Sequence, residues 1–326
     1  MESRAPIAWS WRNLAHGAIL AVPAALLSLF DPAVGVPLAV GVLPAAALGL
    51  RATRRERIFV ILVGALAGLS IFLGALVAPR PVLAVCAVFV LCVIVSLGTA
   101  DGSRRLAPLA LMLGLPLYGA GLSESSWTTG IVAAALILAG SAYACAVSLL
   151  WPQHPSPPRA PRPTLPRRAM LVYGIQIGAA ASLAAAAGFL LGVDHAGWAC
   201  TAALLVSRPD KSQLGARAWG RALSVTGGAI VACTIAATAP TPVAIAGLLV
   251  LTLAVATATA GSRWYIFPFF STVVVLSLLQ LGETDAAAHW FLERVGLTLL
   301  GVALALAAAW AVPALARTSR IGHPAP

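Results

Sequence analysis

Charged residues are scarce in this chain of 326 residues. Asp, Glu, Lys and Arg make up only 10% of it, whereas 60% is hydrophobic, and the mean hydropathy is +0.94. Soluble globular chains carry about 25% charged residues. The shortage therefore excludes a soluble enzyme and a disordered protein. Lysine is almost absent as well, since Lys211 is the only one, which we interpret as the mark of a GC-rich bacterial genome.

Motifs for catalysis or cofactor binding are also lacking. The sequence has no phosphate-binding loop, no H-E-x-x-H zinc motif and no credible Ser-His-Asp set. None of its cysteines forms a C-x-x-C pair, and all stand in apolar runs, which favours packed thiols over a metal or redox site. The apolar stretch after Arg12 continues as an ordinary span, so we expect no cleaved signal peptide. We predict no enzyme activity, no cofactor and no metal.

Long apolar runs dominate what is present. A helix crosses a bilayer with about 20 apolar residues, and the Ala, Leu, Val and Gly composition favours helices over a membrane barrel of alternating strands. The sequence predicts an all-α, polytopic transmembrane bundle. Its twelve expected spans lie at about 12–30, 34–50, 58–78, 81–99, 106–122, 128–151, 169–192, 196–207, 217–238, 242–260, 264–281 and 290–313.

The placement of basic residues predicts the orientation of these spans. With a cytoplasmic N-terminus, all basic residues except Arg80 and Arg294 fall in cytoplasmic segments, as the positive-inside rule requires. One misplaced span would invert every later loop. We therefore predict a multi-pass protein of the bacterial inner membrane with both termini in the cytoplasm. The net charge of +11 reflects this orientation and gives no reason to expect nucleic acid.

The two halves of the chain resemble each other at a shift of about 160 residues. Asp31 parallels Asp194, and the spacing from Arg57 to Gly64 returns after Arg221. Two repeats of six helices share one orientation, because six is an even number. We predict a degenerate first repeat over 1–151, a second repeat over 169–316 and a cytoplasmic tail over 317–326. Between the repeats, the Pro/Arg-rich segment 152–168 should form an extended cytoplasmic linker.

One stretch of the second half follows a recognisable pattern. It combines His-x-x-Trp-Ala, a short apolar stretch, Arg-Pro and a later Arg and Gly element; here these are His195, Trp198, Arg208, Pro209, Arg217, Arg221, Gly227 and Gly228. This pattern resembles the signature of the fusaric acid resistance protein family, also called the aromatic acid exporter family. A second element of the family resembles Arg294-Val-Gly296 and Gly301. The resemblance is clear over about 169–313 and faint over 12–151, where Pro32 replaces the histidine.

The resemblance implies an inner-membrane transporter whose best-known activity is the export of aromatic carboxylic acids. The family's fold is also similar to that of plant aluminium-activated malate channels, which are dimers of six-helix units that conduct organic anions. Large cytoplasmic regions common in the family are absent here.

Seven residues are candidates for a substrate pathway. Arg221, Arg294 and Arg57, the repeat mate of Arg221, carry permanently charged, forked guanidinium groups that suit the binding of carboxylates. The alternative is that these arginines anchor the helices and form interfacial ion pairs. His195, next to Asp194, either couples protons or simply forms interfacial hydrogen bonds. Trp198 and the cluster around Tyr265 either stack on an aromatic substrate or belong to an aromatic belt.

The predicted function is the export of small organic anions, and of aromatic carboxylic acids in particular. The proton gradient would drive it, because the sequence has no ATP-binding element. The inside-negative potential already pushes an anion outward by about 2.3 kcal/mol per charge at 100 mV, so a passive organic-anion channel is one alternative. A non-transporting scaffold or subunit of an envelope complex is another. The predicted partners are the anion and the bilayer, and a homo-oligomer or an envelope partner stays open.

Overall fold

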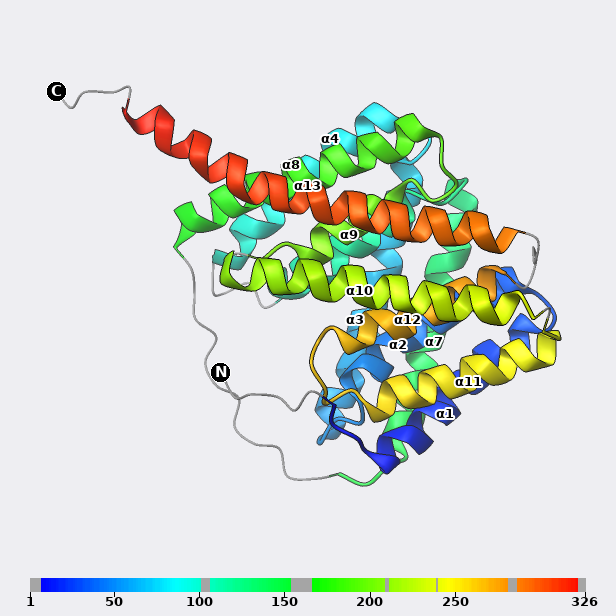
Figure 1. Ribbon diagram of the computed structural model, residues 1–326. Helices are drawn as coiled ribbons and strands as arrows, with labels where there is room; N and C mark the ends of the chain where they lie inside the picture. The colour runs from blue at the N-terminus through cyan, green and yellow to red at the C-terminus, as the bar shows by residue number, and fades with distance from the viewer. Residues whose placement is uncertain are drawn as a thin grey trace. The chain divides into compact units, whose positions relative to one another are not determined.

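The computed structural model describes residues 7–100, 106–153, 166–208, 211–238, 240–280 and 286–321. These residues form 12 helices and no strand, with α5, η1 and α6 running on as one helix (Figure 1). The all-α prediction is confirmed. The helices of the first half are α1 (Trp11–Ser28), α2 (Pro32–Leu48), α3 (Arg54–Val77), α4 (Pro81–Ala100), α5 (Ala107–Leu109), η1 (Ala110–Gly114), α6 (Leu115–Gly121) and α7 (Trp127–Leu149).

The second half contains the other six helices. Its members are α8 (Arg167–Leu191), α9 (Gly197–Val206), α10 (Lys211–Ala236), α11 (Pro242–Ala258), α12 (Ile266–Leu279) and α13 (Ala287–Ile321). The bounds lie near the predicted ones, except that α13 continues through Pro313 into the predicted tail. Most of the predicted linker, the end of the tail, and Glu283 and Asp285 lie outside the described residues.

Several helix ends follow directly from local sequence. Asp31 caps α2 and Thr241 caps α11, because each side chain accepts a hydrogen bond from a backbone N–H of the first turn. A proline follows each cap, where its missing N–H costs nothing. Gly192 ends α8 in the left-handed conformation, with φ at 62°.

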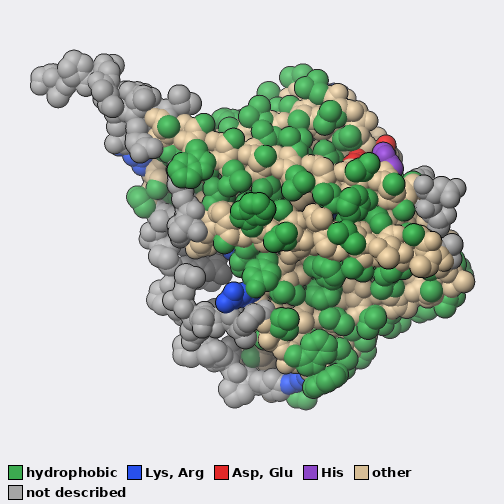
Figure 2. Space-filling model, in the orientation of Figure 1, with side chains coloured by type: hydrophobic (Ala, Val, Ile, Leu, Met, Phe, Trp, Pro, Cys, Tyr) green, Lys and Arg blue, Asp and Glu red, His purple; other side chains and the backbone are tan. Residues whose placement is uncertain are grey.

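The chain is a multi-pass membrane protein. Six helices are long and apolar enough to cross a bilayer, namely Arg54–Val77, Pro81–Ala100, Trp127–Leu149, Arg167–Leu191, Gln213–Ala236 and Ala287–Ala314. Large hydrophobic side chains such as Phe30, Leu190 and Trp310 point outward, at 86%, 88% and 70% exposure. Figure 2 shows a surface made mostly of hydrophobic side chains, with few Lys, Arg, Asp or Glu. Such a surface suits lipid.

The helices gather into two compact units. Unit 1 contains residues 1–69, 131–159 and 223–295, and unit 2 contains residues 70–130, 160–222 and 296–326. Each unit therefore takes helices from both halves of the sequence.

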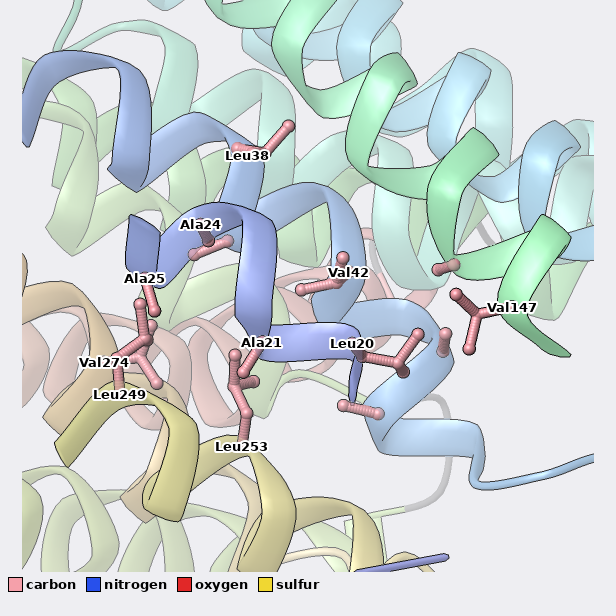
Figure 3. Packing of buried hydrophobic residues seen from close by; sticks show 14 of the residues in the cluster. Leu20, Ala21, Ala24, Ala25, Leu38, Val42, Val147, Leu249, Leu253 and Val274 are labelled. Atoms are coloured by element: carbon pink, nitrogen blue, oxygen red, sulfur yellow. The ribbon is translucent and has the colours of Figure 1, made fainter. Parts of the chain in front are cut away.

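Unit 1 has a hydrophobic core between α1, α2, α3, α7, α11 and α12. Leu20, Leu38, Val42, Leu249 and Leu253 are among its buried side chains (Figure 3). One close approach joins α1 to α11, where a side chain on Gly17 would run into Thr257 and the carbonyl of Leu253. Small residues allow such packing in lipid, where helices gain little from hydrophobic burial against each other.

Unit 2 is held by α4 against α8 and by α6 against α9. The Ser182 hydroxyl of α8 donates to the carbonyl of Val85 on α4 at 3.0 Å. The Thr201 hydroxyl of α9 donates to the carbonyl of Pro116 at 2.9 Å. These hydroxyls satisfy their own hydrogen-bonding needs without water.

Candidate functional site

Arg57 is the most completely bonded charge in unit 1. It lies in the first turn of α3 and is only 1% exposed. A guanidinium has five N–H donors, and here they meet five backbone carbonyls: Nε meets Arg51 at 2.7 Å, Nη1 meets Ser148 at 2.9 Å and Trp151 at 2.5 Å, and Nη2 meets Pro152 at 2.8 Å and Ala52 at 3.4 Å.

These bonds serve the end of a helix. The last carbonyls of a helix have no partner within it, and Ser148 belongs to the last turn of α7, while Trp151 and Pro152 follow it. Arg57 supplies the missing donors and fixes the chain where it leaves α7. In this arrangement the guanidinium has no N–H to offer an anion, so a structural role fits Arg57 better than a place in a pathway.

Two further side chains support the same corner. Arg12 donates to the carbonyl of Pro152 at 2.9 Å and lies 5.7 Å from the centre of the Trp151 ring. Nε2 of His16 lies 2.9 Å from the hydroxyl of Ser148, which itself donates to the carbonyl of Ala144. Because that hydroxyl has one proton, Nε2 must be the donor. No sequence pattern singles out His16, because its partner Ser148 lies far along the chain.

A second group of basic residues lies in unit 2, where α9 ends and α10 begins. The hydroxyl of Tyr173 donates to the carbonyl of Ser207 at 3.2 Å, and Arg208 donates to the same carbonyl at 2.6 Å. Arg208 also contacts the Tyr173 hydroxyl, and Arg217 lies within electrostatic range of both. Arg221 follows one turn later on α10 and is 8% exposed. We call Tyr173, Arg208, Arg217 and Arg221 the basic cluster.

Burial shapes the electrostatics of the basic cluster. It lowers the pKa of Arg208, and the neighbouring Tyr173 opposes this shift. An arginine nevertheless keeps its charge at neutral pH. Arg208 and Arg217 repel each other, so a negative charge near them would relieve the repulsion. Sequence reasoning had selected only Arg221 of this cluster as a site residue. Tyr173 carried no signal beyond being a phenol within an apolar run.

The opposite end of α9 carries the other motif residues. The imidazole of His195 stacks on the indole of Trp198, with ring centroids 4.0 Å apart and an angle of 19° between the planes. Trp198 is buried, His195 is half-buried and Asp194 is exposed. The ten residues of α9 rise about 15 Å, which separates this stacked pair from Arg208. His195 already covers one face of Trp198, so a substrate ring could stack on that face only if His195 moved.

Arg294 lies near the start of α13 in unit 1, next to a buried acid. Glu293 has 2% of its side chain exposed and lies 3.7 Å from Nε2 of His289. It is the one carboxylate buried in the part of the chain that the structure describes. Arg294 is half-buried, with its Nε atom shielded from solvent. Glu293 is not among the site residues predicted from the sequence, although an acid within an apolar run is a visible signal.

Tyr265 occupies the turn before α12, also in unit 1. Its backbone carbonyl accepts a hydrogen bond from Ser224 of α10. Its ring meets Trp264 edge to face, with centroids 5.8 Å apart. The seven predicted residues are thus divided: Arg57, Tyr265 and Arg294 belong to unit 1, and Asp194, His195, Trp198 and Arg221 belong to unit 2.

Fold and charge placement together define a helical, multi-pass membrane protein with buried basic groups. Residues 183–308 match the family model described as "Fusaric acid resistance protein-like". The resemblance predicted from the sequence is therefore confirmed for this stretch, which includes His195, Arg208, Arg221 and Arg294 but not Arg57. No curated protein and no solved structure matches the chain.

Proposed function

We propose that this protein exports small organic anions across the bacterial inner membrane, with aromatic carboxylic acids as the main substrates and the proton gradient as the driving force. Both termini would lie in the cytoplasm. One observation carries the proposal, namely the gathering of Arg208 and Arg217 around Tyr173 within unit 2, with the buried Arg221 one turn further along α10. Guanidinium groups bind carboxylates through two parallel N–H bonds.

The position of the basic cluster suits the entrance of an export route. By the positive-inside rule this end of α9 and α10 faces the cytoplasm. Positive groups flanked by apolar helices concentrate anions, because low-dielectric walls focus the field. The phenol of Tyr173 adds an aromatic surface beside the charges. An aromatic carboxylate meets both requirements at once.

The contrast with Arg57 supports an entrance in unit 2. Arg57 parallels Arg221 in the predicted repeat, but the chain after α7 turns back and fills its donors with carbonyls. The corresponding helix α13 does not turn back at this point and continues to Ile321. We infer that the first repeat has kept the arginine as a structural clamp, whereas the second repeat uses it for anions.

Proton coupling would depend on Glu293. It is a buried carboxylate paired with a histidine that is 55% exposed, so a proton could reach it from solvent through His289. By charge placement this end of α13 faces outward, where the proton concentration is higher in a respiring cell. A proton entering there would drive an anion out. Without coupling, the membrane potential alone would drive the anion, and the protein would be a channel.

Flux through reconstituted protein separates these mechanisms. The purified chain would be placed in liposomes loaded with radiolabelled benzoate, and release would be measured under a pH gradient with and without a protonophore. Release that stops with the protonophore is expected for the proposed exporter. Release that follows an imposed potential but ignores the protonophore would replace the exporter by a channel. No release from folded protein would overturn transport and favour a scaffold.

We also infer that the chain is a tandem duplication of six-helix repeats. In unit 1 a side chain on Gly140 of α7 would meet the carbonyl of Leu38 on α2, and in unit 2 one on Gly301 of α13 would meet the carbonyl of Ala199 on α9. Positions 140 and 38 correspond to 301 and 199 at one common shift of 161 residues. Equal contacts at equal spacing are what a duplicated gene would leave.

A further inference from the structure

We propose that the two repeats exchange helices, so that each compact unit is completed by the other repeat. The first helix of each repeat would carry a surface whose partner is the fourth helix of the opposite repeat. This inference rests on the duplication proposed above but not on transport.

The first observation is which helices pair within each unit. In unit 1 the main partner of α1 is α11, and in unit 2 the main partner of α8 is α4. Figure 1 shows both pairs running side by side. In the repeat, α8 corresponds to α1 and α11 corresponds to α4. The same two surfaces therefore meet twice, and each time they come from different halves of the chain.

The residues at these two interfaces also correspond. Gly17 of α1 packs against Thr257 of α11, and Gly174 of α8 packs against Ser96 of α4. Thr257 and Ser96 are both fully buried and are separated by the shift of 161 residues. Gly174 lies 157 residues after Gly17, so α8 has slid along its partner by about one helical turn. The interface is the same one, with a small change of register.

The second and fifth helices repeat this behaviour. In unit 1, α2 packs on α12, and in unit 2, α9 packs on α6. Thr201 of α9 binds the carbonyl of Pro116, and Gly197 leaves no room for a side chain beside Gly119. By contrast the second and sixth helices pair within one repeat, as Gly140 with Leu38 demonstrates. Among these pairs, exchange involves the fourth and fifth helices.

The limits of the two units agree with this pattern. Unit 1 takes 1–69 and 131–159 from the first half, and unit 2 takes 160–222 and 296–326 from the second. These are nearly the same stretches of the repeat. The middle stretch of the repeat in each unit comes from the other half of the chain: residues 223–295 in unit 1 and residues 70–130 in unit 2. An unexchanged duplication would have divided the chain near the linker instead.

Exchange has a physical consequence for the chain. Interfaces built from Gly17 and Gly174 fit only a partner that approaches closely, because small residues give van der Waals contact along the whole helix. In the exchanged arrangement the fourth helix that covers this face belongs to the other half. The two halves therefore depend on each other for these two interfaces, even though each contains six helices.

Cross-linking in the full chain tests the exchange. In a background with all native cysteines replaced by alanine, one exchanged pair would be Ala21→Cys with Leu253→Cys, whose side chains meet in the core of unit 1 (Figure 3). The other would be Ser182→Cys with Val85→Cys, which are in contact in unit 2. These substitutions avoid the glycines, whose replacement would prevent packing.

The matched controls combine the same four positions differently. Ala21→Cys with Val85→Cys, and Ser182→Cys with Leu253→Cys, join the first and fourth helices of one repeat. Treated in membranes with a short bifunctional thiol reagent and read by mass spectrometry of the linked peptides, both exchanged pairs should react in preference to both controls. Preferential reaction of the controls would overturn the exchange while leaving the duplication intact. Reaction of only one exchanged pair would also overturn it.

Discussion

Arg57 and Trp151 are joined by a hydrogen bond of 2.5 Å from Nη1 to the backbone carbonyl, although they stand 94 positions apart in the chain. The bond belongs to a set that gives every donor of Arg57 a carbonyl. A residue selected for its charge thus turns out to hold the end of a helix. Arg221, its proposed repeat mate, instead lies one turn after Arg217 on α10.

Replacing Arg57 should destabilise the fold. Arg57→Lys keeps the charge but cannot reach five carbonyls, and each hydrogen bond to a charged group contributes about 1.5–3 kcal/mol. We expect a loss on the order of 3 kcal/mol in unfolding free energy and a lower Tm in detergent, measured by tryptophan fluorescence. Arg54→Lys, at an exposed position in the same turn, is the control and should leave Tm unchanged. A Tm equal to wild type for Arg57→Lys would contradict the clamp.

Removing a charge from the basic cluster should weaken anion binding. Arg217→Gln deletes one guanidinium beside Arg208, and we expect the benzoate concentration for half-maximal efflux to rise about tenfold, equivalent to about 1.4 kcal/mol. Efflux from liposomes measures it. Arg168→Gln, an exposed position in the first turn of α8, removes the same charge from the same predicted side and should have no effect. If both variants behave alike, the cluster does not bind the anion.

The same assay applies to Arg294. If it contributes a carboxylate site near the start of α13, Arg294→Gln should raise the half-maximal concentration for efflux by a similar factor, on the order of tenfold. Because the Nε atom of Arg294 is shielded from solvent, the substitution also removes packing, which is a second possible cause of weaker efflux. Arg294→Lys separates the two, since a retained charge should restore part of the affinity. Unchanged affinity in Arg294→Gln would remove this residue from the pathway.

The sequence predicted helices well because lipid imposes one strong condition on them. Long apolar runs located even α9, whose ten residues are too few for an ordinary span. The pairing of helices could not be predicted from the sequence, since α4 and α11 are both apolar runs and their composition does not say which of them packs on α1. The hydrogen bonds of Arg57 could not be predicted either, because their acceptors are backbone carbonyls, which every residue carries. His16 and Tyr173 were overlooked for a similar reason, as their partners become neighbours only after folding.

Coupling to protons should depend on Glu293. Glu293→Gln keeps the shape of the side chain but cannot lose a proton. We expect benzoate efflux from this variant to become insensitive to a protonophore while still responding to an imposed potential. Glu124→Gln, at a half-buried position outside the helices, should behave as wild type. Protonophore-sensitive efflux from Glu293→Gln would exclude this residue as the coupling group.

Two glycines of α13 test helix packing, because alanine substitutions at the two positions should change the stability in opposite directions. A side chain on Gly301 would meet the carbonyl of Ala199, whereas one on Gly296 has nothing within 4 Å. Gly296→Ala should stabilise the helix by up to about 1 kcal/mol, because alanine has the higher helix propensity. Gly301→Ala gains the same propensity but forces α13 away from α9, which costs about 1–3 kcal/mol in a well-packed core. Thermal unfolding in detergent should therefore raise Tm for the first variant and lower it for the second. Equal shifts in both would mean that α13 does not pack on α9 as closely as the contact between Gly301 and Ala199 requires.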